Sequence, residues 1–331
     1  MDRRSELKQW IETRLNALPL TLEPASADAS FRAYFRVRIA GESLIAMDAP
    51  PAHEDCRAFV RIARLMAEAG LNVPRVIAED FERGFLLLSD LGSENYLQAL
   101  NAGSADRLFS DAIDALLRWQ LASKPGVLPP YDEALLTREL MLFPEWYVGR
   151  HRAITLSAAR NDALAAVFAL IVKSNLAQPA VYVHRDYMPR NLMVCAPNPG
   201  VLDFQDAVYG PITYDVASLF KDAFISWDEE RVLDWTARYW EKAKRAGLPV
   251  AADFGEFYRA FEWMGLQRHL KVLGIFARLN YRDGKAGYLA DTPRFVGYVR
   301  AVALRYGALK PLLTLLDEVE GRAAAGAGEP S

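Results

Sequence analysis

The stretch VYVHRDYMPRNLMV (181–194), followed by GVLDFQDAVYG (200–210), decides the fold. It contains three short apolar runs, Val181–Val183, Leu192–Val194 and Gly200–Leu202, which predict short buried strands. Three aspartates and one asparagine gather in the loops where these strands end. We therefore expect the polar side chains to line a cleft.

The order of these polar residues matches a catalytic pattern. The H-R-D at 184–186 and Asn191 have the H-R-D-x-x-x-x-N spacing of a kinase catalytic loop, and Asp203 begins the next loop as in D-F-G. An aspartate can accept a hydroxyl proton, whereas an amide carbonyl and a carboxylate are hard oxygen ligands for magnesium. The alternative is that these side chains only cap loops and turns. Together, the two matches predict phosphoryl transfer.

Length and composition are those of an ordinary globular protein. The 331 residues, 52% hydrophobic and 24% charged, can bury a substantial core in one large or two coupled domains. A net charge of -3 gives no global attraction to nucleic acid. The two cysteines, Cys56 and Cys195, have no metal-ligand spacing, and no segment has about 20 uncharged apolar residues. We expect a cytoplasmic protein without a disulfide framework, membrane span or nucleic-acid partner; the sequence identifies no oligomeric partner.

Hydrophobic periodicity divides the chain into two lobes. The first 90 residues predict a helix, three antiparallel strands, a second helix and two more strands, at roughly 3–18, 20–51, 53–70, 73–80 and 84–92. Beyond them the chain is mainly helical, for example at 104–120. We therefore predict an α+β fold with a small antiparallel-sheet lobe (1–90), a larger helical lobe (91–320) and a flexible tail (321–331).

The motifs HRDYMPRN and LDFQDAVYGPITYDVASL resemble those of the aminoglycoside phosphotransferase and choline kinase family, whose fold is related to protein kinases. A closer similarity is to the cell-wall-recycling kinases that phosphorylate the anomeric C1 hydroxyl of N-acetylmuramate and N-acetylglucosamine. It is carried by SADASFRAYFRV, LIAMDAPP, FPEWYV, HRDYMPRNLM, GVLDFQDAVYGP and QRHLKVLGIFARL. The resemblance covers nearly the whole chain and implies a bilobal protein-kinase-like fold that uses ATP and Mg²⁺. It places the nucleotide site in the first lobe and the catalytic loop, metal site and acceptor pocket in the second.

Position by position, the resemblance implies roles for the motif residues. Asp186 is the expected catalytic base, and Asn191 and Asp203 are the expected metal ligands. Leu88 and Asp90 match the hinge between the lobes, whose backbone binds adenine; an ordinary strand end predicts the same sequence. His184, Asp206 and Asp215 are expected to support the site structurally. Asp206 is the second aspartate of D-F-Q-D, and binding of a second ion is an alternative role for it.

The nucleotide-binding side departs from the family pattern in two places. A-D-A-S-F-R replaces the glycine-rich loop, so Ser30 and Phe31 are candidates for phosphate contacts, with a plain hairpin turn as the alternative. Met47 stands where the third strand should carry a phosphate-binding lysine. Because strand side chains alternate, Arg32 and Arg36 share a face and are candidates to supply the missing cation. The alternative is that both are solvated edge-strand charges.

In the family, C-terminal helices wall the acceptor pocket. Basic side chains on these helices are candidates to bind the lactyl carboxylate of N-acetylmuramate. The alternative is that they are solvated or snorkelling charges. Trp146 offers a flat face to a sugar ring, although buried aromatics more often belong to the core. The remaining substrate candidates are Arg268, His269 and Lys271.

We expect an ATP-dependent sugar kinase acting on N-acetylmuramate, N-acetylglucosamine or both. One alternative is a kinase of another small hydroxyl acceptor, such as an aminoglycoside, a choline-like alcohol or homoserine. An aminoglycoside or choline pocket favours acidic or aromatic residues, whereas a carboxylated sugar favours a cation. The other alternative is a pseudokinase that binds nucleotide and acts as a scaffold. The intact Asp186, Asn191 and Asp203 favour an enzyme, while Met47 favours the scaffold.

Overall fold

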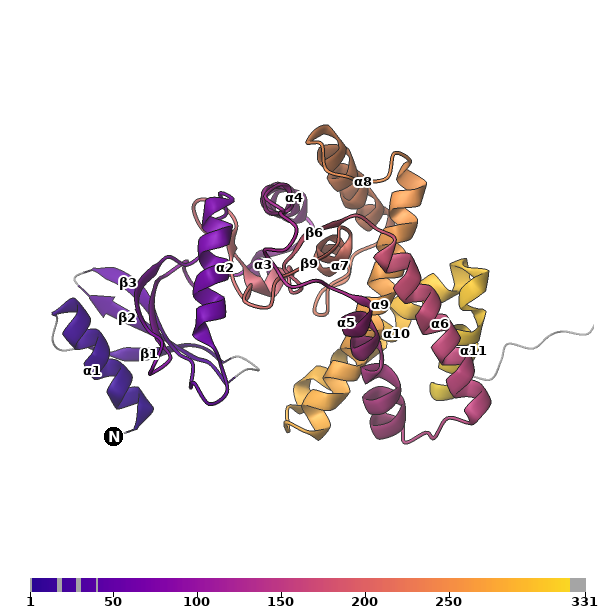
Figure 1. The fold of residues 1–331 in the computed structure, drawn as a ribbon, viewed down its shortest axis with the longest axis horizontal. Helices are drawn as coiled ribbons and strands as arrows, with labels where there is room; N and C mark the ends of the chain where they lie inside the picture. Colours follow the sequence, from indigo (N-terminus) through magenta and orange to yellow (C-terminus); the bar gives the residue numbers. More distant parts are fainter. Residues whose placement is uncertain (1, 17–19, 28–30, 40, 322–331) are drawn as a thin grey trace, which may run out of the picture. The chain divides into compact units, whose positions relative to one another are not determined.

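The computed structural model describes residues 2–16, 20–27, 31–39 and 41–321, so Ser30 and the tail at 322–331 lie outside the described residues. The chain divides into two compact units. The first consists of Met1–Ala122 with Pro189–Ala207, and the second of Ser123–Met188 with Val208–Ser331. The mixture of a small antiparallel sheet with many helices confirms the predicted α+β class (Figure 1).

The first unit contains the predicted βββαββ arrangement. Its antiparallel sheet has the order β1-β2-β3-β5-β4. Gly84, in the turn between the last two strands, has φ +72°, and a Cβ there would lie 1.9 Å from the carbonyl oxygen of Ala49. Only glycine fits that turn without strain. The elements are β1 (Leu22–Ala27), β2 (Ala33–Ile39), β3 (Glu42–Asp48), α2 (Cys56–Glu68), β4 (Val76–Asp80) and β5 (Phe85–Ser89).

An N-terminal helix, α1 (Arg3–Leu15), covers the core of this sheet with Leu7, Trp10 and Ile11. Their partners in the cluster include residues of β2, β3 and β5. Burying such apolar side chains contributes roughly 1.5–3 kcal/mol each. The helix ends earlier than predicted because Asn16 adopts φ 48°, the left-handed conformation that commonly ends helices.

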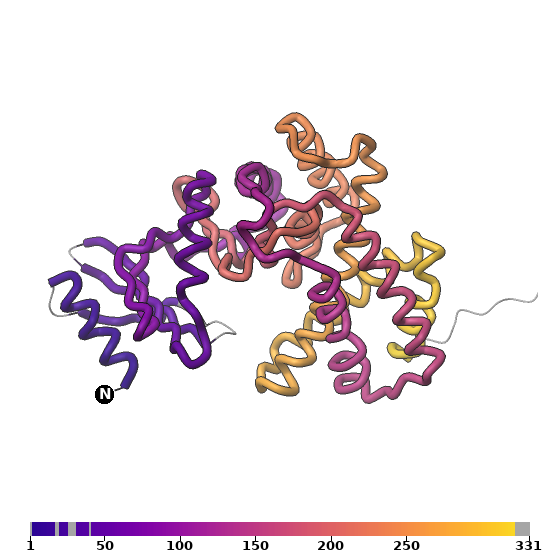
Figure 2. Tube along the Cα trace, viewed as in Figure 1, coloured from indigo at the N-terminus to yellow at the C-terminus, as the bar shows by residue number. Residues whose placement is uncertain are grey.

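The first unit extends beyond the predicted boundary at residue 90. It includes α3 (Tyr96–Ala99), α4 (Ala105–Leu121) and the hairpin of β7 (Leu192–Met193) and β8 (Gly200–Val201). The hairpin is held there because Val194 donates its N–H to the carbonyl of Glu94 (2.9 Å), and Val201 donates to Asn72 (2.8 Å). Phe204 then packs on Phe59 of α2, with ring centroids 4.8 Å apart. In the backbone trace of Figure 2, this segment of the chain accordingly runs beside α2. The loops around Asn191 and Asp203 therefore belong to the first unit.

The second unit is built around α9 (Phe254–Tyr281), which contacts most of its other helices. Helix α9 closely approaches the start of η1 (Phe143–His151), since a Cβ on Gly274 would lie 2.3 Å from the backbone of Leu142. Two short strands pair antiparallel, and the second of them, β9, was not predicted. The other elements are α5 (Glu133–Leu140), the π-helix η1 (Phe143–His151), α6 (Ala158–Leu176), β6 (Ala180–Val183), β9 (Val208–Pro211), α7 (Tyr214–Phe220), α8 (Glu229–Arg245), η3 (Ala286–Asp291), α10 (Thr292–Arg305), η4 (Gly307–Leu309) and α11 (Lys310–Val319).

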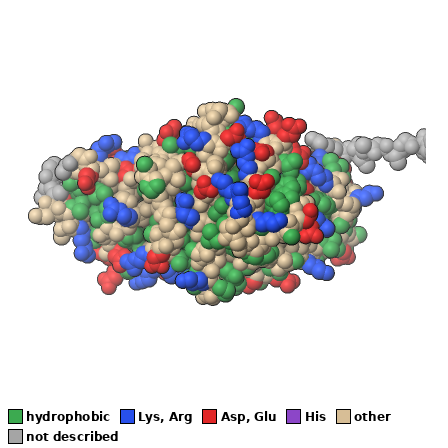
Figure 3. Space-filling view, turned by 90° about the horizontal axis from the view of Figure 1, so that it is seen from above, with side chains coloured by type: hydrophobic (Ala, Val, Ile, Leu, Met, Phe, Trp, Pro, Cys, Tyr) green, Lys and Arg blue, Asp and Glu red, His purple; other side chains and the backbone are tan. Residues whose placement is uncertain are grey.

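The surface carries charges of both signs. Lys and Arg side chains lie among Asp and Glu side chains on the face in view in Figure 3. This mixing agrees with a sequence that has 39 basic and 42 acidic residues. None of the helices within the described ranges combines the length and hydrophobicity that crossing a membrane requires.

Candidate active site

Strand β6 leads directly into the H-R-D loop, and Asp215 at the start of α7 holds that loop. The buried carboxylate of Asp215 accepts the backbone N–H of His184 at 2.7 Å and that of Arg185 at 3.0 Å. Arg185 has φ +77°, which is costly for a residue with a side chain. The two hydrogen bonds therefore stabilise a strained turn immediately before Asp186.

The environment of Asp215 also changes its acidity. Burial raises the pKa of this carboxyl to about 7, while the two N–H donors and the nearby Arg268 act in the opposite direction. An ionised Asp215 accepts these hydrogen bonds more strongly than a protonated one. The proton on Asp215 is therefore linked to how firmly the loop is held.

Asp186 itself is half-buried. Its N–H donates to Nδ1 of His184 at 3.2 Å, and its carbonyl accepts the N–H of Met188 at 2.9 Å. His184 is buried and packs edge-on against Tyr187, with ring centroids 5.6 Å apart. In this structure His184 thus bonds within the loop.

In the first unit, Asn191 and Asp203 lie side by side. Asn191 ends the 3-10 helix η2 (Pro189–Asn191), and its Nδ2 lies 3.4 Å from Oδ2 of Asp203. Asp203 has φ +62°, and its other oxygen accepts Nε2 of Gln205 at 2.9 Å. Asp206, by contrast, is exposed.

This pair has the donor chemistry of a magnesium site. Mg²⁺ prefers hard oxygen ligands and is usually held by one or two carboxylates together with water and substrate phosphates. Asn191 and Asp203 supply a side-chain amide, whose oxygen is a hard ligand, and a carboxylate, and the two groups lie within hydrogen-bonding reach of each other through the amide nitrogen. Across the part of the chain that the structure describes, no group of three or more His, Cys, Asp or Glu residues is placed to hold a metal. The residues therefore fit Mg²⁺ bound together with phosphates better than a metal enclosed by protein ligands.

Arg32 lies next to this pair. Its Nη2 is 3.7 Å from Oδ1 of Asp203, and its Nε is 3.9 Å from Oε2 of Glu54. Glu54 also accepts the N–H of Phe31 at 3.4 Å, and the Phe31 ring stacks on His53 with centroids 4.5 Å apart. The end of the hairpin thus presents one cation beside the candidate metal ligands.

Arg36 has different partners from Arg32, and Met47 is fully buried. Arg36 donates to Asp90 at 2.6 Å and to the carbonyl of Gly92 at 2.9 Å. Burial would raise the pKa of Asp90, but Arg36 and a serine hydroxyl lower it. Since β2 lies between β1 and β3, Arg36 is not an edge-strand charge, and Arg32 directly precedes β2. Arg36 fixes the side chain of Asp90 at the end of β5, where Leu88 is buried in the sheet.

In the second unit, the buried side chains of Arg268 and Asp222 each have a polar atom without a hydrogen-bond partner among the described residues. Arg268 is 3% exposed, and its Nη2 lies 3.8 Å from the sulfur of Met188, two residues after Asp186. Within the described residues, its Nη1 has no hydrogen-bond partner, and neither has Oδ1 of Asp222, which is 1% exposed. Burial raises the pKa of Asp222, and the charge of Arg268 opposes that shift. Asp222 was not predicted; its only signal was an acidic residue in the apolar run VASLFKDAF.

The other substrate candidates lie in different surroundings. His269 is buried against Phe295 and Tyr298, and burial holds its pKa well below the ordinary value. Lys271 donates to Glu139 at 2.9 Å and to the hydroxyl of Tyr214 at 3.1 Å. Trp146 is half-buried in η1.

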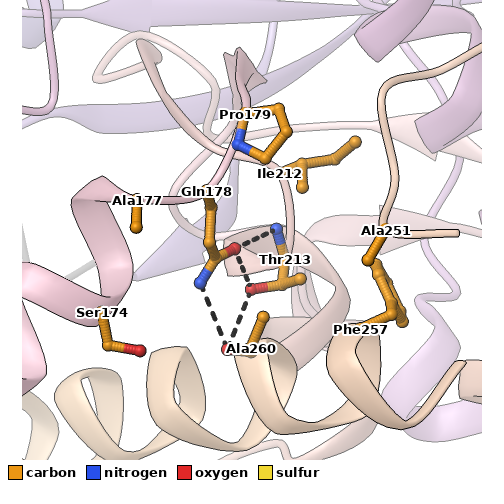
Figure 4. A pocket seen from close by; sticks show the side chains of 9 residues that line it. All are labelled: Ser174, Ala177, Gln178, Pro179, Ile212, Thr213, Ala251, Phe257 and Ala260. Atoms are coloured by element: carbon orange, nitrogen blue, oxygen red, sulfur yellow. Dashed lines mark hydrogen bonds between the residues drawn. The ribbon is translucent and has the colours of Figure 1, made fainter. Parts of the chain in front are cut away.

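A pocket of about 200 Å³ lies elsewhere in the second unit, between α6, α9 and the start of α7. None of the predicted site residues lines it. Gln178 accepts from the hydroxyl of Thr213 at 2.7 Å and donates to the carbonyl of Ala260 at 3.2 Å (Figure 4). The side chains of Gln178 and Thr213 thus bond to each other, and the lining residues of this pocket are separate from those of the candidate active site.

Residues 21–254 match the model of the phosphotransferase enzyme family. The chain is 53% identical to an N-acetylmuramate/N-acetylglucosamine kinase of Pseudomonas putida (98% of both chains covered). It is 47% identical to one of Neisseria meningitidis serogroup B (97% of both covered).

Solved structures show the same fold at low identity. A choline/ethanolamine kinase family protein from Mesorhizobium loti is 16% identical with a TM-score of 0.63, covering 96% of this chain and 100% of that one. The ADP-bound aminoglycoside phosphotransferase APH(2'')-Ib is 13% identical with a TM-score of 0.60, covering 88% and 97%. These similarities confirm the predicted protein-kinase-like fold class.

Proposed function

The chain belongs to the phosphotransferase enzyme family, and from this we propose that it is an ATP-dependent sugar kinase of cell-wall recycling. It would transfer the γ-phosphoryl group to the anomeric C1 hydroxyl of N-acetylmuramate, N-acetylglucosamine or both, in the cytoplasm. Support for these sugars comes from relatives of that name at 47–53% identity over nearly the whole chain. The observation that carries the reaction class is the H-R-D loop, in which Asp215 fixes the backbone just before Asp186.

Asp186 is the proposed catalytic base. It would accept the proton of the acceptor hydroxyl as the new phosphate bond forms. Phosphoryl transfer depends mainly on positioning and electrostatics. The position of the base, which its backbone fixes, therefore matters more than an unusual reactivity of its carboxylate. The hydrogen bonds that join Asp186 to His184 and Met188 support this role.

Asn191 and Asp203 are the proposed magnesium ligands, and bound Mg²⁺ would neutralise charge on the phosphates. Arg32, beside Asp203 and Glu54, would supply the phosphate-binding cation that Met47 lacks. The backbone at Ser30 and Phe31 would contact phosphate. The backbone at Leu88 and Asp90 would contact adenine.

Arg268 is the proposed ligand of the lactyl carboxylate of N-acetylmuramate. Its nearly complete burial beside Met188, with Nη1 unpartnered among the described groups, supports binding of an anionic group. Asp222, with an oxygen in the same condition, would accept a sugar hydroxyl or amide N–H. Trp146 would stack on the sugar ring.

The experiment is a measurement of ADP release from magnesium-ATP with a panel of acceptors. The panel contains N-acetylmuramate, N-acetylglucosamine, aminoglycosides, choline and homoserine. The proposal predicts turnover with the two amino sugars. Turnover only with another member would assign a different acceptor, and nucleotide binding without turnover on any acceptor would favour the scaffold.

A further inference from the structure

Behind the catalytic loop, the second unit contains a buried group of charges centred on Glu139. This residue of α5 is 5% exposed. One carboxylate oxygen binds the guanidinium of Arg185 and, at 2.9 Å, the ammonium of Lys271. The other accepts the hydroxyl of Tyr131 and, at 3.1 Å, Nε2 of Gln267. All of its hydrogen-bonding capacity is thus directed into the protein.

The charges of this group depend on one another. Burial alone would raise the pKa of Glu139, but Lys271 and Arg185 hold it at about 2. Burial alone would lower the pKa of Lys271, but Tyr214 and Glu139 raise it. Two cations therefore share a single carboxylate, and removing it would take the same counter-charge away from both.

Arg185 links this group to the catalytic base. Asp215 binds its backbone N–H, Glu139 binds its side chain, and the next residue is Asp186. With φ +77°, Arg185 occupies a conformation that persists only where the surroundings impose it. Its side-chain and backbone bonds constrain it from two different helices, α5 and α7.

We infer that Glu139 is a positioning residue for phosphoryl transfer: by binding the guanidinium of Arg185 it fixes the loop conformation from which Asp186 projects. This inference rests on the proposed phosphoryl transfer, whichever hydroxyl is the acceptor. It also gives Lys271 the role of supporting Glu139, which is an alternative to the role of binding a substrate carboxylate directly.

Glu262 provides a matched control. It is 1% exposed, and its carboxylate also binds an arginine and a tyrosine, Arg305 and, at 2.7 Å, Tyr306. Both of these partners lie at the end of α10, away from the catalytic loop in the sequence. Glu262→Gln therefore removes the charge of another buried, arginine-bound carboxylate without removing a partner of Arg185.

The kinetic test compares Glu139→Gln, Glu139→Asp and Glu262→Gln at a temperature where circular dichroism shows each to be folded. We expect Glu139→Gln to lower kcat at least about tenfold while the KM values for ATP and acceptor change less than about twofold. Glu139→Asp, which keeps the charge, recovers part of kcat, and Glu262→Gln stays within about twofold of the wild type. An equal loss of kcat in Glu139→Gln and Glu262→Gln, or a change confined to KM, overturns the inference.

A second readout does not need activity. Hydrogen exchange followed by mass spectrometry reports the opening of the loop peptide 183–188. Glu139→Gln should accelerate exchange at the Arg185 amide about tenfold, and Glu262→Gln should leave it unchanged. Unaltered exchange in Glu139→Gln overturns the inference. If the wild type phosphorylates no acceptor, the proposed function fails, whereas the exchange result still decides whether Glu139 fixes the loop.

Arg185→Met covers the case in which Glu139→Gln does not fold. It leaves Glu139 and Lys271 as a pair of one anion and one cation, so no buried carboxylate loses its last cation. The inference predicts the same pattern of lower kcat, unchanged KM and faster exchange. Wild-type kcat in this variant overturns it.

Discussion

The carboxylate of Asp215 accepts the backbone N–H of Arg185 at 3.0 Å, which ties the first turn of α7 to the residue that precedes the proposed base. The same carboxylate binds the N–H of His184 at 2.7 Å. A single buried side chain thus sets the backbone on both sides of the peptide bond that joins His184 to Arg185.

This relationship predicts a pH-dependent stability. The pKa of Asp215 is raised from 3.8 to about 7 by burial, so its bound proton stabilises the folded state fully below about pH 4, and this contribution is lost as the pH rises through 7. The free energy of unfolding of the wild type minus that of Asp215→Asn should therefore decrease between pH 4 and 8, by at most about 4 kcal/mol. Urea unfolding at several pH values measures it. A difference that is constant or grows with pH would contradict the assignment.

Removing a metal ligand should change the magnesium requirement. Asp203→Ala deletes a carboxylate ligand, so the Mg²⁺ concentration for half-maximal activity should rise at least about tenfold, and Asn191→Ala should act in the same direction. Asp206→Ala is the control, because this side chain is exposed and three residues further along the chain. A similar loss in Asp206→Ala would point to a second ion, and an unchanged requirement in Asp203→Ala would exclude it as a ligand.

The two arginines of the second strand region should behave differently. Arg32→Ala removes the cation beside Asp203, so the KM for ATP should rise or turnover should fall at least about tenfold, equivalent to about 1.4 kcal/mol. Arg36→Ala breaks the pair with Asp90 and should mainly lower the melting temperature. Steady-state kinetics with varied ATP and thermal unfolding separate the two effects. Wild-type ATP kinetics in both single variants and in the double variant would contradict the proposal that one of these arginines replaces the lysine missing at position 47.

Much of this site could be predicted because its chemistry fixes residue types at short spacings. The strands β6, β7 and β8 lie within about a residue of the apolar runs that predicted them. The loop between β6 and β7 carries Asp186 and Asn191, and the loop after β8 carries Asp203. Strand β9 was missed because its sequence, VYGP, contains the Gly and Pro that are typical of turns.

Contacts between residues distant in sequence could not be predicted. Glu139 binds Arg185 across 46 residues, and an isolated acidic residue on a helix gives no sign of such a partner. The first unit extends beyond the predicted lobe boundary at residue 90 for a related reason. Hydrogen bonds from the β7–β8 hairpin to Glu94 and Asn72 join segments that a pattern along the chain leaves apart.

Substrate discrimination should depend on Arg268. If its guanidinium binds the lactyl carboxylate, Arg268→Gln should raise the KM for N-acetylmuramate at least about tenfold and that for N-acetylglucosamine, which lacks the carboxylate, much less. Lys271→Met should instead lower kcat on both sugars alike, because Lys271 is bound to Glu139. Kinetics of each variant on both sugars test this. Parallel losses in Arg268→Gln would indicate damage to packing, and a loss confined to N-acetylmuramate in Lys271→Met would make Lys271 the ligand.

The central claim is that Asp186 takes the proton from the anomeric hydroxyl during transfer from ATP. The most direct measurement is phosphorus NMR of the reaction with N-acetylmuramate and magnesium-ATP, for the wild type and for Asp186→Asn. We predict a sugar phosphate signal coupled to the anomeric proton in the wild type. In Asp186→Asn it should form at least about 100-fold more slowly, while nucleotide binding is retained. Phosphate at another position of the sugar, or near-wild-type rates in the variant, would contradict the claim.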